Sequence, residues 1–344
     1  MEFAPSLNMV RRSPFRALPL TGLALVAGGL ILLSWLVWSL MKPSEPLYRY
    51  TLQTQGGADL FPELGLTGKQ DLRIKKYSID IEGAERPAAY AYIGESERSG
   101  PVLLQWDNQV AEPLLYTDSK IAEATALADR IGDYVTDKTE ILGWWDVSQK
   151  LMLLCECSPV ITGHLRKPLL LPEIWQSQLQ AVEQVESAYW LSIDAAEQDK
   201  LQVFADALLM DEQQAAVRLR ELTGGRSSFL VLHITDAFKL GVLRPESIGI
   251  GYKDFPDTGD MHGMIQRVKE WLSGKGYKHY IVERRGEAVV RVYFLTTNPT
   301  PSQPLITRLL PFRELGPTGL SQFSLVDQLG GYWVYRLEGK PPEG

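Results

Sequence analysis

Ile141-Leu142-Gly143-Trp144-Trp145-Asp146 is the stretch from which the fold of this 344-residue chain is inferred. A short apolar run, long enough for one strand, ends there in two adjacent tryptophans and an acid. Apolar side chains spaced three and four residues apart predict a helix over residues 119–135, and a second helix is expected over 147–154. A strand between two helices is typical of an α/β protein.

The alternation of helices and strands continues downstream, which predicts a mixed α/β core over residues 118–338 and a short tail over 339–344. The nearly continuous apolar run at 229–234 indicates a strand that is covered on both faces. Asp211 is the first residue of a helical pattern at 211–222 and is expected to cap this helix. Further helices are predicted at 172–190, 203–209 and 264–272, and further strands at 277–282 and 289–296.

The segment before the core is rich in strand patterns. Alternating polar and apolar residues at 73–81, with further candidates at 88–93 and 102–106, predict a β-rich segment over residues 71–117. Residues 42–70 are punctuated by proline and glycine, so we expect them to form a stalk or linker.

The N-terminal part contains a long uncharged apolar segment at residues 17–41. About 20 such residues in a helix span the hydrocarbon layer, which predicts a single transmembrane helix. Arg11, Arg12 and Arg16 precede it, so residues 1–16 are expected to form a cytoplasmic tail. The bulk of the chain would then lie outside the inner membrane, in the periplasm of a bacterium. No small-residue cleavage site follows the segment, which favours an uncleaved anchor over a signal peptide.

The charge balance argues against nucleic acid as a partner. Residues 1–45 carry a net charge of +2, which leaves −9 of the total of −7 on the rest of the chain. Phosphate binding needs a basic stripe, which this distribution does not favour. A basic protein partner is compatible with it, as is simple solubility.

Trp144, Trp145 and Asp146 are the first candidates for binding residues. The two indole rings would give a platform for a peptide or another partner. Neighbouring residues leave a strand on opposite faces, so the alternative is one ring in the core and one on the surface. Asp146 is expected either to cap the following helix or to bind a ligand.

Asp236 and Lys239 are the second candidates. They follow the predicted buried strand, and ligand crevices of α/β sheets form at such strand ends. The alternative role is a structural salt bridge or a helix cap.

Cys155 and Cys157 leave three interpretations open. A disulfide across one residue is expected to be strained. The pair would therefore be two partly buried thiols, a link to another chain, or, with His164, a weak candidate for a soft-metal or redox site. There is no Cys-x-x-Cys-His sequence for covalent haem attachment.

Other chemistry-bearing residues form no recognisable site. The four histidines have no metal-ligand spacing, and His233 lies in an apolar run typical of a core position. Asp260 and His262 lie in a glycine-rich loop over 251–263, which is a weak functional signal. No nucleotide-binding loop, zinc-protease or serine-hydrolase motif occurs. We therefore predict no catalytic residues, no metal site and no cofactor.

Trp144-Trp145-Asp146 and the patterns around it resemble the soluble C-terminal domain of oligosaccharyltransferase catalytic subunits. In that family Tyr-Gly follows Trp-Trp-Asp, whereas Val147-Ser148 stands here. The capped helix at 211–222 and the strand at 229–234 also fit, and the resemblance covers residues 121–337. The family's active site lies between many membrane helices. A chain with one predicted membrane helix does not carry it.

A second resemblance covers the full length. Gly143-Trp144-Trp145-Asp146, Pro168-Leu169-Leu170-Leu171-Pro172-Glu173-Ile174-Trp175 and Asp236-Ala237-Phe238-Lys239 resemble the hydroxylamine oxidation protein B family, HaoB. This resemblance implies nitrification and a multihaem hydroxylamine oxidoreductase as partner. The expected function is a non-catalytic, membrane-anchored periplasmic accessory protein that docks, assembles or tethers that enzyme.

Two other functions remain open at this point. One is a peptide- or glycan-binding module related to the transferase domain, with Trp144 and Trp145 in contact with the ligand. The other is an enzyme that uses Cys155, Cys157 or His262.

Overall fold

The computed structural model describes most of the chain. The described residues are 18–41, 47–66, 68–69, 71–97, 99–110, 112–132, 134, 139–155, 157–163, 168–190, 195–285, 288–296, 304–317 and 319–339. Two compact units are separated between Glu45 and Pro46. Each unit is considered separately below.

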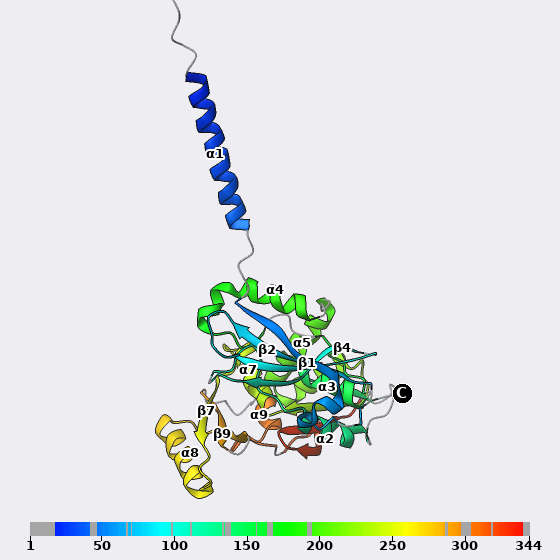
Figure 1. Ribbon diagram of the computed structural model, residues 1–344. Helices are drawn as coiled ribbons and strands as arrows, with labels where there is room; N and C mark the ends of the chain where they lie inside the picture. Colours follow the sequence, from blue (N-terminus) through cyan, green and yellow to red (C-terminus); the bar gives the residue numbers. More distant parts are fainter. Residues whose placement is uncertain are drawn as a thin grey trace, which may run out of the picture. The chain divides into compact units, whose positions relative to one another are not determined.

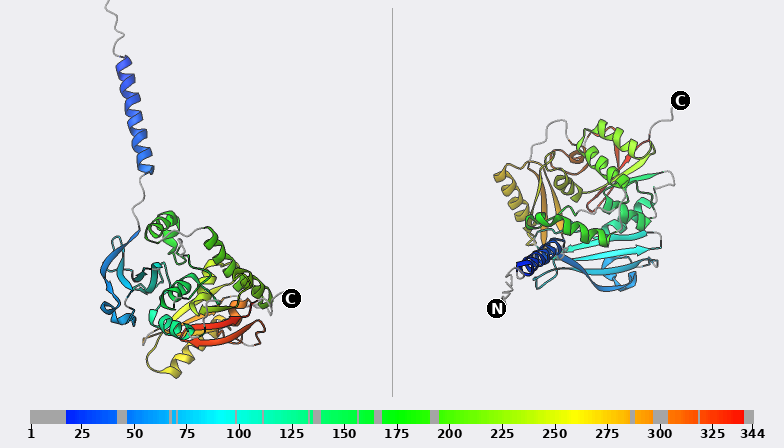
Figure 2. Two further views of the ribbon diagram at one scale, coloured as in Figure 1. Left: turned by 90° about the vertical axis from the view of Figure 1, so that its right-hand side faces the viewer. Right: turned by 90° about the horizontal axis from the view of Figure 1, so that it is seen from above.

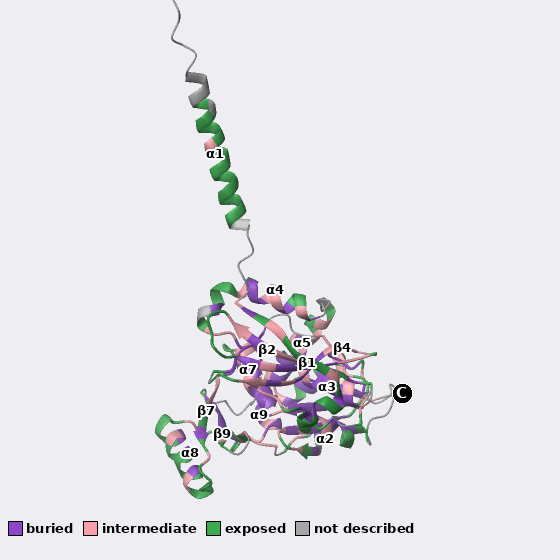
Figure 3. Cartoon of the chain, in the orientation of Figure 1, coloured by how far each residue is buried: buried purple, intermediate pink, exposed green. Residues whose placement is uncertain are grey.

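The first unit contains one helix, α1 (Leu18–Met41), which confirms the helical part of the prediction for residues 17–41. Its described side chains, such as Leu25 and Trp35, are mostly exposed (Figure 3). Nowhere in the described part of the chain is a helix both sufficiently long and sufficiently apolar to cross a bilayer.

The second unit begins with a four-stranded antiparallel sheet whose strands follow one another in chain order (Figure 1). Its first strand differs from the sequence prediction, because it lies inside the expected stalk over 42–70 and pairs along its length with the second strand. The strands are β1 (Tyr48–Gly57), β2 (Arg73–Ile81), β3 (Ala89–Ser96) and β4 (Ser99–Asn108), with short 3₁₀ turns at Ala58–Leu60 and Pro62–Leu64.

The second sheet has the strand order β10-β11-β6-β5. Among the described strands of this sheet, only β5 and β6 pair in parallel. β5 belongs to the tryptophan-containing segment. β6 is almost completely buried, as the apolar run predicted. The strands are β5 (Glu140–Gly143), β6 (Ser228–His233), β10 (Phe323–Leu329) and β11 (Tyr332–Leu337).

Helices surround this sheet. Those predicted at 119–135, 147–154 and 211–222 are present, whereas α7 after β6 was not predicted and α5 is longer than expected. The helices are α2 (Ile121–Gly132), α3 (Trp145–Cys155), α5 (Ala195–Leu209), α6 (Glu212–Leu222), α7 (Thr235–Leu243) and α9 (Leu305–Leu309). The helix predicted at 172–190 is divided into a 3₁₀ segment, Glu173–Gln178, and α4 (Leu179–Tyr189).

A third, smaller layer consists of a three-stranded antiparallel sheet and one helix, with a small apolar core of its own. Figure 2 shows its helix, in yellow, beside the sheet. Its first strand occupies part of the loop that we expected over 251–263. The elements are β7 (Ile250–Pro256), α8 (Met261–Lys275), β8 (Tyr280–Arg285) and β9 (Val289–Leu295).

One continuous apolar core joins the first two sheets. It runs from Tyr48 in β1 to Leu337 in β11. The segment over 71–117 and the core over 118–338, which we expected as separate parts, therefore belong to one compact unit that begins at Pro46.

The predicted cap of α6 is confirmed, because the Asp211 carboxylate accepts hydrogen bonds from the backbone N–H groups of Gln213 and Gln214, both at 3.0 Å. We expect Asp211→Ala to lower the free energy of unfolding by about 1 kcal/mol, since two N–H groups lose their acceptor. Urea unfolding measures this change. Asp211→Asn is the control and should retain most of the stability. An alanine variant as stable as the parent chain would show that the cap contributes nothing.

Candidate functional site

The Trp-Trp-Asp turn connects β5 to α3, and both of its tryptophans are buried. Trp144 is 0% and Trp145 is 3% exposed. The indole of Trp144 faces Phe204, whereas that of Trp145 faces Tyr116. The prediction that one ring would be exposed is therefore wrong, because both faces of this strand end are covered. Neither ring gives an exposed platform for a peptide or glycan.

Asp146 occupies the first turn of α3, which begins at Trp145, and its carboxylate accepts a hydrogen bond from the backbone N–H of Val147 at 3.0 Å. Its carboxylate accepts hydrogen bonds from Lys239 Nζ at 2.7 and 3.0 Å. Lys239 also donates to Asp236 at 2.9 Å, one helical turn earlier in α7. The structure thus unites three of the predicted site residues in a salt-bridge triad, Asp146–Lys239–Asp236.

The triad joins the ends of two neighbouring strands. Asp236 Oδ2 also accepts a hydrogen bond from the backbone N–H of His233, the last residue of β6, at 2.8 Å. Asp146 follows β5, which is parallel to β6. Both carboxylates therefore lie at the carboxyl edge of the parallel pair, where the sequence placed a crevice. The structure shows a salt bridge there.

Opposite charges outweigh burial within the triad. Burial alone would lower the pKa of Lys239, but the carboxylates of Asp146 and Asp236 reverse this effect and raise it. Burial would likewise raise the pKa of Asp146, but the ammonium groups of Lys239 and Lys150 lower it. Lys239 and Asp146 are accordingly charged at neutral pH.

Lys150 is a residue of this centre that sequence reasoning missed. It is only 1% exposed, although it is a lysine. Burial lowers the pKa of Lys150 to about 8, and the nearby charge of Lys239 acts in the same direction. A signal existed in the sequence, because Lys150 follows Asp146 by four residues and so lies on the same helix face.

His233 connects the triad to the protein surface. Its Nδ1 accepts a hydrogen bond from the backbone N–H of Thr235 at 3.2 Å, which places the ring proton on Nε2 when the imidazole is neutral. Nε2 lies 3.9 Å from the half-exposed carboxylate of Glu123. The interaction with His233 lowers the pKa of Glu123. His233 is therefore a partly buried polar residue and not an ordinary core position.

Two small cavities flank the Asp146–Lys239 pair, and both are lined by Thr117 and Ser119 as well as by the pair itself. One is largely apolar and includes both tryptophans; the other is polar and includes Lys150 and His233. Each has a volume of about 20 Å³. A water molecule fits such a space, whereas ligand pockets usually measure some ~300–1,000 Å³.

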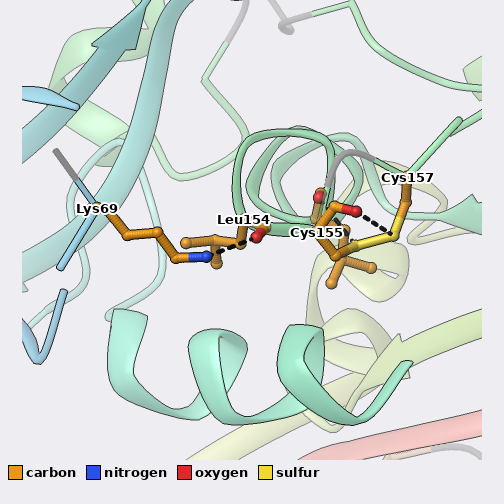
Figure 4. The surroundings of a disulfide bond; sticks show 5 residues. Lys69, Leu154, Cys155 and Cys157 are labelled. Carbon is orange, nitrogen blue, oxygen red and sulfur yellow. Dashed lines mark hydrogen bonds between the residues drawn. A yellow bond between two sulfur atoms is a disulfide. The ribbon is translucent and has the colours of Figure 1, made fainter. Parts of the chain in front are cut away.

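Cys155 and Cys157 form a disulfide at the end of α3, which corrects all three interpretations that the sequence left open (Figure 4). Their Cα atoms are 5.2 Å apart, a separation usual for disulfides. The neighbouring carbonyl of Leu154 accepts a hydrogen bond from Lys69 at 3.0 Å. His164 lies outside the described residues. Within those residues no group of three or more His, Cys, Asp or Glu side chains could hold a metal ion.

The Asp260–His262 candidate has a structural explanation. The Asp260 carboxylate caps α8 by accepting a hydrogen bond from the backbone N–H of Gly263 at 3.0 Å. His262 is exposed.

These features define a class of protein: a mixed α/β fold in which the buried Lys239 is paired with two carboxylates at the ends of two parallel strands. The sequence profile of one family, described as HaoA-associated protein HaoB, matches residues 15–337. The chain therefore belongs to the HaoB family, and the resemblance seen in the sequence is confirmed. No curated protein and no solved structure matches it, so the likeness to the oligosaccharyltransferase domain has no support from these comparisons.

Replacement of Trp144 tests its role in the core. Trp144→Ala should lower the free energy of unfolding by about 3–5 kcal/mol, because it leaves a cavity beside Phe204. Chemical denaturation followed by circular dichroism measures the loss. Val217→Ala on the exposed surface of α6 is the control, with a change within about 0.5 kcal/mol. A Trp144→Ala chain of parental stability would contradict the buried position.

Lys150 should make stability depend on pH. Its pKa is about 8 in the folded chain against 10.5 for an ordinary lysine, so the unfolded chain binds more protons between these values. The contribution of Lys150 to the free energy of unfolding therefore rises as pH increases from 8 toward 10.5. Lys150→Met should be more stable than the parent chain at pH 7, and the difference should shrink above pH 8.

Urea unfolding of both chains at several pH values measures this difference. Buried tyrosines lose stability in alkali in both chains, so their effect cancels in the comparison. A difference that stays constant with pH would show that Lys150 has an ordinary pKa.

Proposed function

We propose that this chain is a non-catalytic accessory protein that binds HaoA, the multihaem hydroxylamine oxidoreductase, and supports its assembly or docking. The family match over residues 15–337 carries this proposal, because the members of this family are described as HaoA-associated proteins. The match includes all three sheets, so the whole folded unit belongs to the associated protein.

The small size of the two cavities at the triad supports a role exerted at the surface. Lys239 is held by two carboxylates, and the cavities beside it are large enough only for molecules of about the size of water. The tryptophans that would have bound a peptide or glycan are buried. The polar centre is thus suited to hold the fold together, and a partner would contact other residues.

The disulfide between Cys155 and Cys157 supports a location outside the cytoplasm. Reducing systems keep cytosolic cysteines as thiols, whereas disulfides persist in the periplasm and other oxidising compartments. We therefore propose that the second unit meets HaoA in such a compartment.

The charge of the second unit suggests how the partner is attracted. Residues 46–344 carry a net charge of −9. Complementary charge steers association and makes it sensitive to ionic strength. A basic surface on HaoA would therefore face this unit.

Binding of the purified full-length chain to purified HaoA tests the proposal directly. We expect a complex in surface plasmon resonance at low salt, with an association rate that falls as sodium chloride is added. An unrelated multihaem cytochrome of similar isoelectric point is the control and should not bind. The absence of a complex at low salt would overturn the proposal. So would unchanged hydroxylamine-dependent respiration after deletion of the gene.

A further inference from the structure

A second buried polar centre surrounds Glu186 in α4. Its carboxylate is completely buried and accepts hydrogen bonds from three phenols and one indole. Tyr48 donates to Oε1 at 2.5 Å and Tyr50 to the same oxygen at 3.0 Å. Tyr116 and Trp190 donate to Oε2, the latter at 2.9 Å. Two donors on each oxygen match the capacity of an ionised carboxylate.

The phenols belong to a continuous path of aromatic rings. Ring centroids are 6.0 Å apart for Trp145 and Tyr116, 6.5 Å for Tyr116 and Trp190, and 5.5 Å for Trp190 and Tyr189. Tyr189 stacks on Tyr50 at 4.1 Å. Tyr189 and Tyr50 are half-buried, so the path runs from the buried Trp145 to the surface.

The contacts within this path exceed what packing alone requires. Aromatic pairs are stabilised at such centroid distances with or without a hydrogen-bond donor on the ring. Here, however, three separate phenols converge on one base, although phenylalanine rings would pack in the same places. Transfer of a carboxylate from water to the interior costs free energy even when hydrogen bonds satisfy it. The arrangement therefore indicates a function beyond packing.

A phenol next to a base is suited to one-electron oxidation. Burial and the charge of Glu186 raise the pKa of Tyr50 and Tyr116, so neither phenol loses its proton by itself. Burial also raises the pKa of Glu186 and makes its carboxylate a stronger base. The proton can therefore leave the phenol only together with an electron, and the hydrogen bond already points to its acceptor.

We propose that Tyr48, Tyr50 and Tyr116 around Glu186 form a redox-active site that gives one electron to a one-electron oxidant of the high-valent haem class. The O–H bond of one tyrosine breaks and its proton moves to the Glu186 carboxylate, which becomes a carboxylic acid. The electron leaves along the aromatic path and reduces the oxidant by one equivalent. A neutral tyrosyl radical remains, and return of one electron restores the phenol and the carboxylate.

Tyr335 provides a matched control within the same chain. It is also buried, but its hydroxyl donates to the backbone carbonyl of Leu309 at 2.5 Å. A carbonyl oxygen does not take up a proton at neutral pH. Oxidation of Tyr335 would leave the proton without a destination, so this residue should not form the radical.

Flash oxidation of the full-length chain by photogenerated tris(bipyridine)ruthenium(III), with freeze-quenched electron paramagnetic resonance, tests the proposal. The expected result is a tyrosyl radical whose formation is slower in heavy water, because a proton moves with the electron. Glu186→Gln should lower the radical yield about tenfold, whereas Tyr335→Phe should leave it unchanged. If Glu186→Gln does not fold, the triple change Tyr48→Phe, Tyr50→Phe and Tyr116→Phe should give the same loss.

Three results would overturn the proposal. One is a parental radical yield in Glu186→Gln or in the triple variant. Another is an equal loss in Tyr335→Phe. The third, which needs no variant, is radical formation in the unmodified chain at the same rate in light and heavy water. None of these readouts involves HaoA, so they stand apart from the proposed function.

Discussion

The buried ammonium of Lys239 between Asp146 and Asp236 is the interaction on which the rest of the second sheet depends. It joins the turn after β5 to the turn after β6, the two strands that form the parallel pair. Removal of one partner from a buried ion pair typically costs about 3–5 kcal/mol, since the other charge is left without compensation. Because the turn after β5 must bring Asp146 to Lys239, it also places Trp144 and Trp145 inside the core. The Trp-Trp-Asp sequence is thus explained by folding.

Two polar centres meet at this turn. Trp145 contacts Tyr116, and Tyr116 donates to Glu186, so the residues next to the triad also line the aromatic path. The first centre contains paired charges and has room only for water-sized molecules, which supports a structural role. In the second centre, three phenols donate hydrogen bonds to a single base, which supports electron transfer. In the proposed scheme, this HaoA-associated protein uses its surface for the partner and its aromatic interior for the transfer of an electron.

The sequence predicted the elements whose signals lie within a few neighbouring residues. The apolar run of β6, the helix periodicity of α2 and the Asp211 cap of α6 were all visible without a structure. Features that depend on distant partners were not. The sequence of β1 resembles a linker, because pairing with β2 is what makes this segment a strand. Lys150 resembles a surface residue in the sequence, because only tertiary packing buries it. The buried position of both tryptophans likewise depends on distant partners, Phe204 for Trp144 and Tyr116 for Trp145.

A double-mutant cycle on Asp146 and Lys239 tests the central claim most directly. The claim is that this pair couples the two strand ends and thereby fixes the Trp-Trp-Asp turn. Asp146→Ala and Lys239→Met should each lower the free energy of unfolding by about 3–5 kcal/mol, and the double variant should lose much less than the sum. Losses that simply add would show that the two side chains act independently, and this result would contradict the account.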